Sequence, residues 1–287
     1  MMEFRTQVAI NEPPFLIEPC EEILFVGSCF ADAIGQRFRE EAFPVTVNPF
    51  GVMYNPASIL HTLQRIAWDE TSPRTVFLTL GTNHVYRLKE TNEIVDNCEK
   101  RPASLFQEEV LSVEQCADYL RQAVALLRGV NPDMRIVLTV SPIRYRKYGY
   151  HESQLSKATL LLAIEKLVAT IPAASPAGSV TTAAGFPAGS VSYFPAYEIV
   201  LDELRDYRFY AADMLHPSAQ AVEYIWERLV ESYFSPAAQN YLAEWRPLKQ
   251  ALAHKPFSPD SPEYRAFHEQ TLLKLTEFKK KYSHLAL

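Results

Sequence analysis

Five short apolar runs, rich in β-branched and aromatic residues, alternate with amphipathic segments over the first two thirds of the chain. The runs lie at residues 23–26, 43–47, 76–80, 136–141 and 191–194. Segments with apolar residues about every 3.6 positions fall between them, at 29–40, 56–67, 112–128 and 155–169. Strands without polar alternation, separated by helices, are typical of a parallel sheet covered on both faces. The pattern predicts an α/β fold, a three-layer αβα sandwich with a parallel sheet of about five strands.

The chain after residue 235 has a helical pattern, which predicts two units. We expect an α/β domain over 1–235 and a helical C-terminal extension over 236–287. The extension either packs on the domain or pairs with a second copy, so a homo-oligomer through these helices is an open expectation. A hairpin is predicted at 86–97. The segment 172–190, rich in Ala, Pro, Gly and Ser, has little to bury and is interpreted as a surface loop, with a lid as the alternative.

The composition argues against several classes of protein. Acidic residues outnumber basic ones by 34 to 28, which disfavours nucleic-acid binding. No secretory signal is predicted, and no stretch approaches the roughly 18 apolar residues of a membrane helix. The cysteines, Cys20, Cys29, Cys98 and Cys116, are too widely spaced to predict a zinc site or a disulfide framework. We expect a cytoplasmic protein without a metal or cofactor, and without a nucleic-acid or membrane partner.

Residues that follow the predicted strands are candidates for chemistry, because ligands of such sheets gather at the carboxyl ends of the strands. The candidates of this kind are Ser28, Cys29, Gly51, Asn83, His84, Arg144, Asp213 and His216. A hydroxyl becomes a nucleophile when a base removes its proton and a third group orients that base. Asp213 and His216 are one helical turn apart, a spacing that suits a carboxylate–imidazole pair. The same spacing also arises by chance on a protein surface.

Ser28 and Cys29 compete for the role of nucleophile. We expect the first turn residue to be exposed at the sheet edge and the second to turn inward, which favours Ser28 and makes Cys29 a packing residue that borders the pocket. A plain helix cap is the alternative role of Ser28. Gly51, Asn83 and the Ser28 N–H are candidate oxyanion donors, with ordinary turn roles as the alternative for the first two. Arg144 either grips a substrate or pairs with a surface carboxylate.

Several strings along the chain carry a resemblance to a known family. They are FVGSCFA, NPFG, LGTNH, TVSPIR, YFPAYEIVLDELRDYRFY and DMLHPS, in this order. They closely resemble the GSCFA domain family, which is related to the SGNH/GDSL hydrolases, and the resemblance covers about residues 20–235. It implies an SGNH-type domain with the following site: nucleophile Ser28, triad partners Asp213 and His216, and oxyanion residues Gly51 and Asn83. His84 stands at the position where the related hydrolases have Asp. We therefore expect His84 to line the substrate pocket.

The resemblance implies a serine esterase that hydrolyses small acyl esters, with O-acetyl groups on carbohydrates as the favoured substrate. One alternative is an acyltransferase on the same fold, in which an acceptor hydroxyl replaces water. Another is a non-catalytic binding or scaffolding module. The sequence does not identify the acyl or the alcohol part of the substrate.

Overall fold

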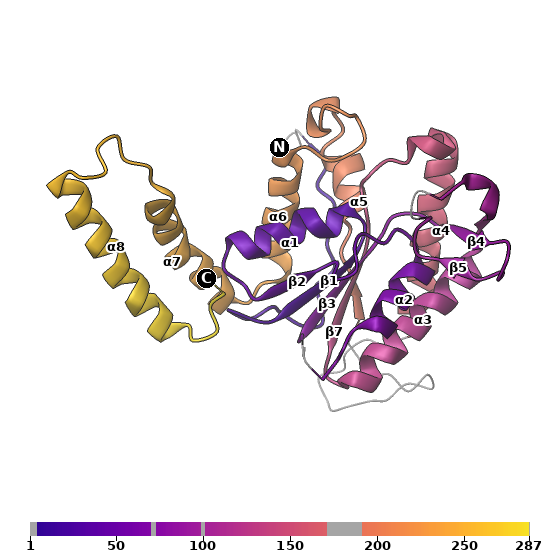
Figure 1. Ribbon diagram of the computed structural model, residues 1–287, viewed down its shortest axis with the longest axis horizontal. Coiled ribbons are helices and arrows are strands. Elements are labelled where there is room, and N and C mark those ends of the chain that lie inside the picture. The colour runs from indigo at the N-terminus through magenta and orange to yellow at the C-terminus, as the bar shows by residue number, and fades with distance from the viewer. Residues whose placement is uncertain (1–4, 70–72, 99–100, 171–190, 287) are drawn as a thin grey trace.

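The computed structural model describes residues 5–69, 73–98, 101–170 and 191–286. At its centre is a parallel sheet with the strand order β2-β1-β3-β7-β8 (Figure 1). These strands are β1 (Ile23–Gly27), β2 (Val45–Val47), β3 (Thr75–Leu80), β7 (Arg135–Val140) and β8 (Val191–Tyr193). The prediction of a parallel sheet of five strands is confirmed. The segment 172–190, interpreted above as a loop or lid, lies outside the described residues.

Helices cover both faces of this sheet (Figure 1). One face carries α1 (Cys29–Glu40) and α6 (Ala219–Tyr233), and the other carries α2 (Pro56–Arg65), α3 (Val113–Val130) and α4 (Tyr150–Val168). Short helical turns fill the connections: η1 (Ala103–Leu105), η2 (Arg146–Tyr148), α5 (Ala196–Glu198), the π-helical η3 (Ile199–Glu203) and η4 (Tyr207–Phe209). The three-layer αβα sandwich is therefore confirmed.

The side chains of the central strands alternate between two cores. Phe25 on β1 pairs with Phe77 on β3, and the two rings stack with centroids 4.5 Å apart on the side of α1 and α6. Their neighbours Leu24 and Val26 point to the opposite core, under α2, α3 and α4. Because both faces of the strand are buried, the sequence of β1 is apolar throughout.

A small antiparallel sheet is inserted between β3 and α3. It has the order β5-β4-β6 and consists of β4 (His84–Leu88), β5 (Ile94–Val95) and β6 (Phe106–Val110). The hairpin predicted at 86–97 corresponds to β4 and β5. The remaining strand of this sheet, β6, has the sequence FQEEV and is largely exposed. Its sequence therefore has no apolar pattern from which a strand could be predicted.

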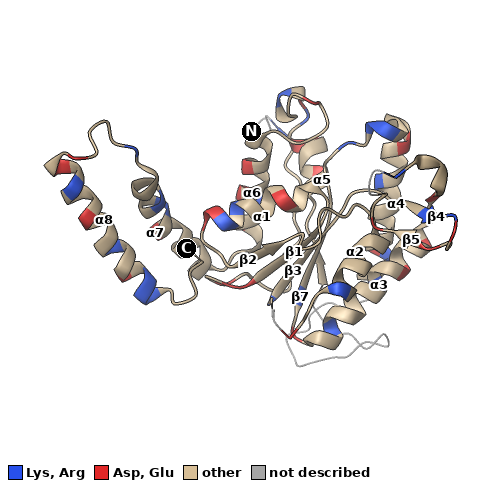
Figure 2. Ribbon diagram, in the orientation of Figure 1, with Lys and Arg blue, Asp and Glu red and all other residues tan. Residues whose placement is uncertain are grey.

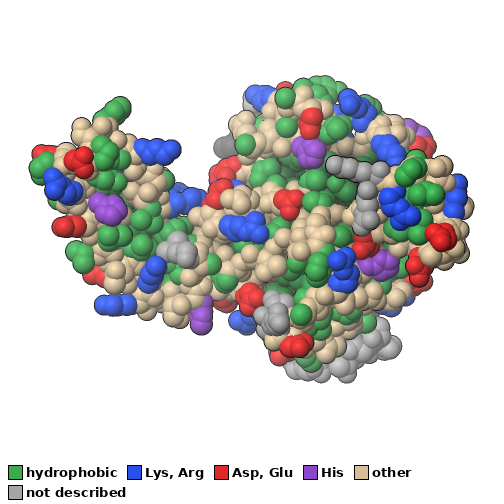
Figure 3. Space-filling model, viewed as in Figure 1, with side chains coloured by type: hydrophobic (Ala, Val, Ile, Leu, Met, Phe, Trp, Pro, Cys, Tyr) green, Lys and Arg blue, Asp and Glu red, His purple; other side chains and the backbone are tan. Residues whose placement is uncertain are grey.

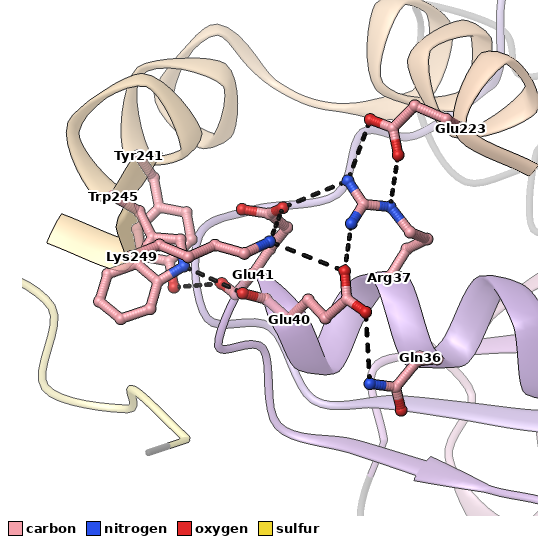
Figure 4. A network of polar contacts seen from close by, with 8 residues as sticks. All are labelled: Gln36, Arg37, Glu40, Glu41, Glu223, Tyr241, Trp245 and Lys249. Atoms are coloured by element: carbon pink, nitrogen blue, oxygen red, sulfur yellow. Dashed lines mark hydrogen bonds and ion pairs between the residues drawn. The ribbon is translucent and has the colours of Figure 1, made fainter. Parts of the chain in front are cut away.

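The C-terminal helices α7 (Pro236–Ala253) and α8 (Pro262–Lys281) form a hairpin beside the α/β domain (Figure 1). The start of this hairpin is fastened to the end of α1 (Figure 4). Tyr241 donates its hydroxyl hydrogen to the Glu41 carbonyl at 2.7 Å, and Trp245 donates its indole N–H to the Glu40 carbonyl at 3.2 Å. The Lys249 ammonium lies 2.8 Å from the Glu41 carboxylate. A homo-oligomer through these helices stays a prediction.

Surface charge of both signs is spread over the domain and the hairpin (Figure 2). Three lysines end α8, and one of them, Lys281, pairs with Glu244 of α7 at 2.6 Å. A cleft of about 720 Å³, bordered by Trp226 and Arg246, lies between α6 and α7, where the space-filling view shows the hairpin standing off the domain (Figure 3). Of the helices described, none is long and apolar enough to cross a membrane. The cytoplasmic location stays a prediction.

Gly27 ends β1 at the point where the chain turns into α1. Its φ is +148°, and a Cβ atom there would lie 2.2 Å from the Thr79 carbonyl oxygen of β3. The Gly27 N–H donates to the Asn48 side-chain oxygen at 2.8 Å. This close approach of two backbones requires a residue without a side chain.

We expect Gly27→Ala to lower the free energy of unfolding by about 3 kcal/mol or more, because the added methyl group must displace the backbone of β3. Gly129→Ala is the matched control, since Gly129 lies near the end of α3 with open space around its Cβ position. There we expect a gain of about 0.5–1 kcal/mol. Urea unfolding of both variants measures the two changes, and a Gly27→Ala protein as stable as the wild type would contradict the close contact.

Candidate active site

Ser28 is turned into the protein at the end of β1. Its side chain is fully buried, with 0% exposure. Its Oγ accepts the Phe30 N–H at 3.3 Å, which caps α1, and lies 3.2 Å from Thr79 Oγ1. The expectation that Ser28 is exposed is therefore wrong. Its alternative role, the N-cap of α1, is present in the structure. In the described part of the chain, Ser28 makes no hydrogen bond to His216, so the nucleophile–base contact is absent.

Cys29 is the first residue of α1 and packs against the core as expected, but it is only partly buried and so does not turn fully inward. Its Sγ lies 3.8 Å from the Tyr54 hydroxyl. Its N–H is at the free N-terminus of the helix, and we find no acceptor for it among the described residues. The order of exposure is reversed because Ser28, with extended backbone angles, folds its hydroxyl back over the first turn of the helix. Of the two nucleophile-capable side chains, the thiol is the accessible one.

Asp213 and His216 form the pair that the spacing predicts. The imidazole Nδ1 lies 2.6 Å from Asp213 Oδ2, and Oδ1 accepts the N–H groups of His216 at 3.0 Å and Leu215 at 2.8 Å. These hydrogen bonds, led by the one from the His216 backbone, lower the pKa of Asp213 to about 2, so its carboxylate is charged at neutral pH. Both side chains are partly exposed, at 44%. Ser218 caps the following helix, α6, and Pro217 lies just outside it.

Arg144 braces the turn that carries this pair. Its N–H donates to the Leu215 carbonyl at 3.1 Å, and its guanidinium donates to the Met214 carbonyl at 3.0 Å. The guanidinium also lies over the ring of Tyr150, 4.2 Å from its centroid. Met214 has a φ of +61°, a left-handed conformation that these hydrogen bonds help to hold. Arg144 pairs with backbone carbonyls, so the alternative of pairing with a surface carboxylate is wrong, and its predicted role in gripping substrate stays a prediction.

Two helices bring Cys29 and His216 to the same edge of the sheet. The first, α1, begins at the carboxyl end of β1, and the second, α6, begins just after His216. They pack together through the ion pair of Arg37 with Glu223 at 3.0 Å (Figure 4). Past the end of α6, Phe234 bridges to Ile17, which precedes β1 at the opposite edge. Both helices therefore begin at the edge where the parallel strands end.

The backbone donors expected for an oxyanion are already engaged. The Gly51 N–H donates to the Asn48 carbonyl at 2.8 Å, within a turn where Gly51 has a φ of +91°. The Ser28 N–H donates to the Thr79 carbonyl at 3.0 Å. Both donors have backbone acceptors in this structure, and their assignment to the oxyanion stays a prediction. A turn role, the alternative for Gly51, is the one found.

Asn83 and His84 contact the inserted sheet. The Asn83 side chain is only 2% exposed, and its amide nitrogen donates to the Leu111 carbonyl at 2.7 Å. Its side-chain oxygen is buried without a hydrogen-bond partner among the described residues. His84 Nδ1 lies 2.8 Å from the Glu108 carboxylate, and its ring stacks on Tyr148 at 3.8 Å between centroids. One of the two N–H groups of the Asn83 amide therefore supports the fold near the site, and the assignment of Asn83 as an oxyanion donor stays a prediction.

Tyr54 is a residue of this edge that the sequence analysis did not select. Its carbonyl accepts the N–H groups of Gly81 and Thr82, both at 2.8 Å, which ties the loop before α2 to the end of β3. Its ring packs edge-on against Tyr145, with centroids 5.8 Å apart. Burial, followed by the charge of the neighbouring Cys29, raises the pKa of the Tyr54 phenol to about 12. The signal in the sequence is its position between a strand and the N-cap of the next helix.

Lys157 is a buried cation beneath the same edge. Its ammonium donates to the carbonyls of Gly81 at 2.6 Å and Ser141 at 2.8 Å, which follow β3 and β7. Burial lowers the pKa of Lys157 to about 7. In the sequence it falls on the apolar stripe of α4 with Leu160 and Ile164, where a lysine is unusual. Lys157, on α4, therefore links the carboxyl ends of β3 and β7.

The buried lysine predicts how stability changes with pH. Because folding lowers the pKa of Lys157 from 10.5 to about 7, the unfolded chain binds more protons than the folded one between these values. The contribution of this group to the free energy of unfolding therefore rises from about pH 7 to pH 10. Lys157→Met removes the titration, so we expect a smaller rise for the variant in chemical unfolding across this range. Lys166→Met, at an exposed position of the same helix, should keep the wild-type slope. Equal slopes for all three proteins would contradict the burial of the amine.

Comparison with solved structures finds chains of similar fold at low identity. A Streptococcus pneumonia protein provisionally described as a platelet activating factor is 15% identical over 76% of this chain and 85% of its own, with a TM-score of 0.46. An acetyl esterase mutant with an acetate ion is 11% identical over 78% and 99%, with a TM-score of 0.43. A family 3 carbohydrate esterase from Talaromyces cellulolyticus is 12% identical over 73% and 94%, with a TM-score of 0.41. At this level of likeness, activity has to be argued from the chain's own residues.

No curated protein matches the sequence. Two family models do match it. The model described as "GSCFA domain protein, C-terminal domain" matches residues 245–287, which include most of α7 and all of α8. The model of the GSCFA family matches residues 22–75 and 71–229, from β1 through most of α6, and so covers the sheet and both candidate segments of the site. The chain therefore belongs to the GSCFA family.

Proposed function

We propose that this protein hydrolyses small acyl esters, with Cys29 as the nucleophile and the Asp213–His216 pair as the base. The observation that carries the proposal is the order of exposure at the end of β1. The Cys29 thiol is accessible, whereas the Ser28 hydroxyl is fully buried and caps α1. A thiolate is also a stronger nucleophile than a hydroxyl at neutral pH. The proposed reaction is the ester hydrolysis expected from the resemblance. The proposed attacking atom is the sulfur of Cys29, in place of the oxygen of Ser28.

The proposed reaction proceeds through a thioester. His216 takes the proton of the Cys29 thiol, and the sulfur adds to the ester carbonyl to form a tetrahedral oxyanion. Its collapse breaks the ester C–O bond, and the imidazolium returns the proton to the leaving alcohol. Water then loses a proton to His216, attacks the thioester and releases the carboxylic acid, while the proton returns to sulfur. The net change is one ester and one water to one acid and one alcohol.

The electrostatics of the edge support these steps. Cys29 is the first residue of α1, where the helix dipole and the unpaired Cys29 N–H favour negative charge on the oxyanion. The Asp213 carboxylate, ionised at neutral pH, fixes the imidazole through Nδ1 and stabilises the imidazolium that forms. Arg144 holds the turn that carries this pair against the end of β7.

The substrate class follows from the family's resemblance to the SGNH/GDSL hydrolases, and an O-acetyl group on a carbohydrate is the substrate that we propose. If an acceptor alcohol replaces water in the second half of the reaction, the same thioester gives an acyltransferase. Product analysis with and without candidate alcohols separates the two. A non-catalytic binding module would form no thioester at all.

The proposal predicts different effects for the two neighbouring residues. Cys29→Ala and His216→Ala should each lower kcat/KM for p-nitrophenyl acetate by about 10³-fold or more, because the nucleophile and its base act as a unit. Ser28→Ala should keep turnover within about threefold and lose about 1 kcal/mol of stability, because it removes a helix cap. Steady-state kinetics and urea unfolding on the same preparations measure these effects. Cys98→Ala controls for background acylation, since this partly exposed thiol lies outside the site.

Mass mapping identifies the acylated atom directly. We expect iodoacetamide to modify Cys29 and abolish turnover, and acid-quenched samples to carry an acetyl thioester on the same residue. A fluorophosphonate adduct on Ser28, together with an inactive Ser28→Ala and an active Cys29→Ala, would return the nucleophile role to serine. Wild-type turnover in all of these variants would leave no hydrolase at this edge.

A further inference from the structure

We infer that Tyr54 is the oxyanion donor of this site. In this assignment its phenol hydroxyl, together with the Cys29 N–H, holds the carbonyl oxygen of the acyl group while sulfur is bonded to the carbonyl carbon. The inference rests on the proposed function, since it names a catalytic group for the same reaction. It departs from the Gly–Asn donor set that the resemblance to SGNH/GDSL hydrolases implies.

Another donor is considered because the expected ones already make contacts in this structure. The Gly51 N–H and the Ser28 N–H both donate to backbone carbonyls, and one of the two N–H groups of the buried Asn83 amide donates to the Leu111 carbonyl. A reaction that builds negative charge on oxygen without a donor forfeits the largest electrostatic contribution to catalysis. A donor that already lies beside the Cys29 sulfur is therefore the one that we consider.

Among the side chains that the structure describes, the Tyr54 hydroxyl is the one hydrogen-bonded to this sulfur, with O and Sγ 3.8 Å apart. In a tetrahedral adduct the oxyanion is only two bonds from sulfur. A hydroxyl at this distance is therefore able to reach the range of about 2.7–3.1 Å that oxyanion donors occupy. Tyr54 as a residue is 38% exposed, so it is not sealed in the core. The distance and the exposure both suit a group that donates a hydrogen bond to a substrate oxygen.

The backbone and ring of Tyr54 are held on both sides. Its carbonyl accepts two N–H groups from the residues after β3, Gly81 and Thr82. Its ring packs edge-on against Tyr145, whose own hydroxyl is buried against Gly81. A donor that is fixed before the substrate arrives needs no reorganisation when charge develops. Tyr54 is therefore preorganised by contacts with the end of the neighbouring strand.

The charge state of Tyr54 also suits a donor. Burial, with the thiol as the next contribution, raises the pKa of its phenol to about 12, so the hydroxyl keeps its proton at neutral pH. The Cys29 N–H supplies a second donor from the N-terminus of α1. The phenol of the loop before α2 and the first N–H of α1 are thus the two donors that we assign.

The test is Tyr54→Phe, which removes one oxygen atom and keeps the ring. We expect kcat for p-nitrophenyl acetate to fall by about 10²-fold, with KM within about threefold, because the hydroxyl acts on the oxyanion more than on the bound ester. Alkylation of Cys29 by iodoacetamide builds no oxyanion, so its rate should stay within about threefold of the wild type. Acetaldehyde, which forms a hemithioacetal with a thiol, should protect Cys29 from alkylation less well in the variant. Tyr264→Phe, which removes a hydroxyl from α8, is the matched control and should leave all three measurements unchanged.

Two results would overturn the inference while leaving the proposed function in place. One is a Tyr54→Phe enzyme with wild-type kcat that still depends on Cys29. The other is a loss of turnover matched by an equal loss of alkylation rate and a lowered unfolding midpoint, which would mean that Tyr54 only supports the fold. Wild-type turnover in Cys29→Ala would overturn the proposed function itself, and this inference with it. The two failures are therefore distinguished by which variant keeps its activity.

Discussion

The contact between Gly27 and Thr79 determines the geometry of the whole candidate site. The two backbones approach so closely that no side chain fits between them, and the Ser28 N–H and hydroxyl then both bond to Thr79. Asn48 holds the same turn from the other side by accepting the Gly27 N–H. With residue 28 fixed inward in this way, α1 has to begin with residue 29 on the outer side of the turn. The accessible position is thus a consequence of strand packing and is independent of which side chain occupies it.

The adjacent Ser28 and Cys29 have different roles in our proposal, the helix cap and the nucleophile, which a single side chain performs poorly. A cap oxygen has to accept the helix N–H groups and stay in place, as Ser28 does for Phe30. A nucleophile needs a free lone pair and room for an approaching carbonyl, and the buried Ser28 has no such room. Cys29 is partly exposed and lies at the helix N-terminus, a source of positive potential. In the Gly-Ser-Cys order the helix cap therefore comes first and the nucleophile that we propose comes second.

The sequence was informative where burial sets the pattern. All five central strands and the helices between them were predictable, because a sheet covered on both faces leaves unbroken apolar runs and an amphipathic helix leaves a period near 3.6. The spacing of Asp213 and His216 also predicted their hydrogen bond, which is present. The direction of each side chain was not predictable, because it depends on partners far away in the chain. Thr79 fixes Ser28, Leu111 takes the Asn83 amide, and neither contact leaves a local signature.

The exposed base sets the same requirement for either nucleophile. A serine hydroxyl and a cysteine thiol both need the imidazole within hydrogen-bond reach when the proton leaves. Among the described residues, His216 is hydrogen-bonded through its ring to Asp213 and to neither Ser28 nor Cys29, and its side chain is 44% exposed. Its position on the sheet edge is set by the turn that Arg144 holds through the carbonyls of Met214 and Leu215. In the mechanism that we propose, this turn determines how closely the imidazole approaches the thiol.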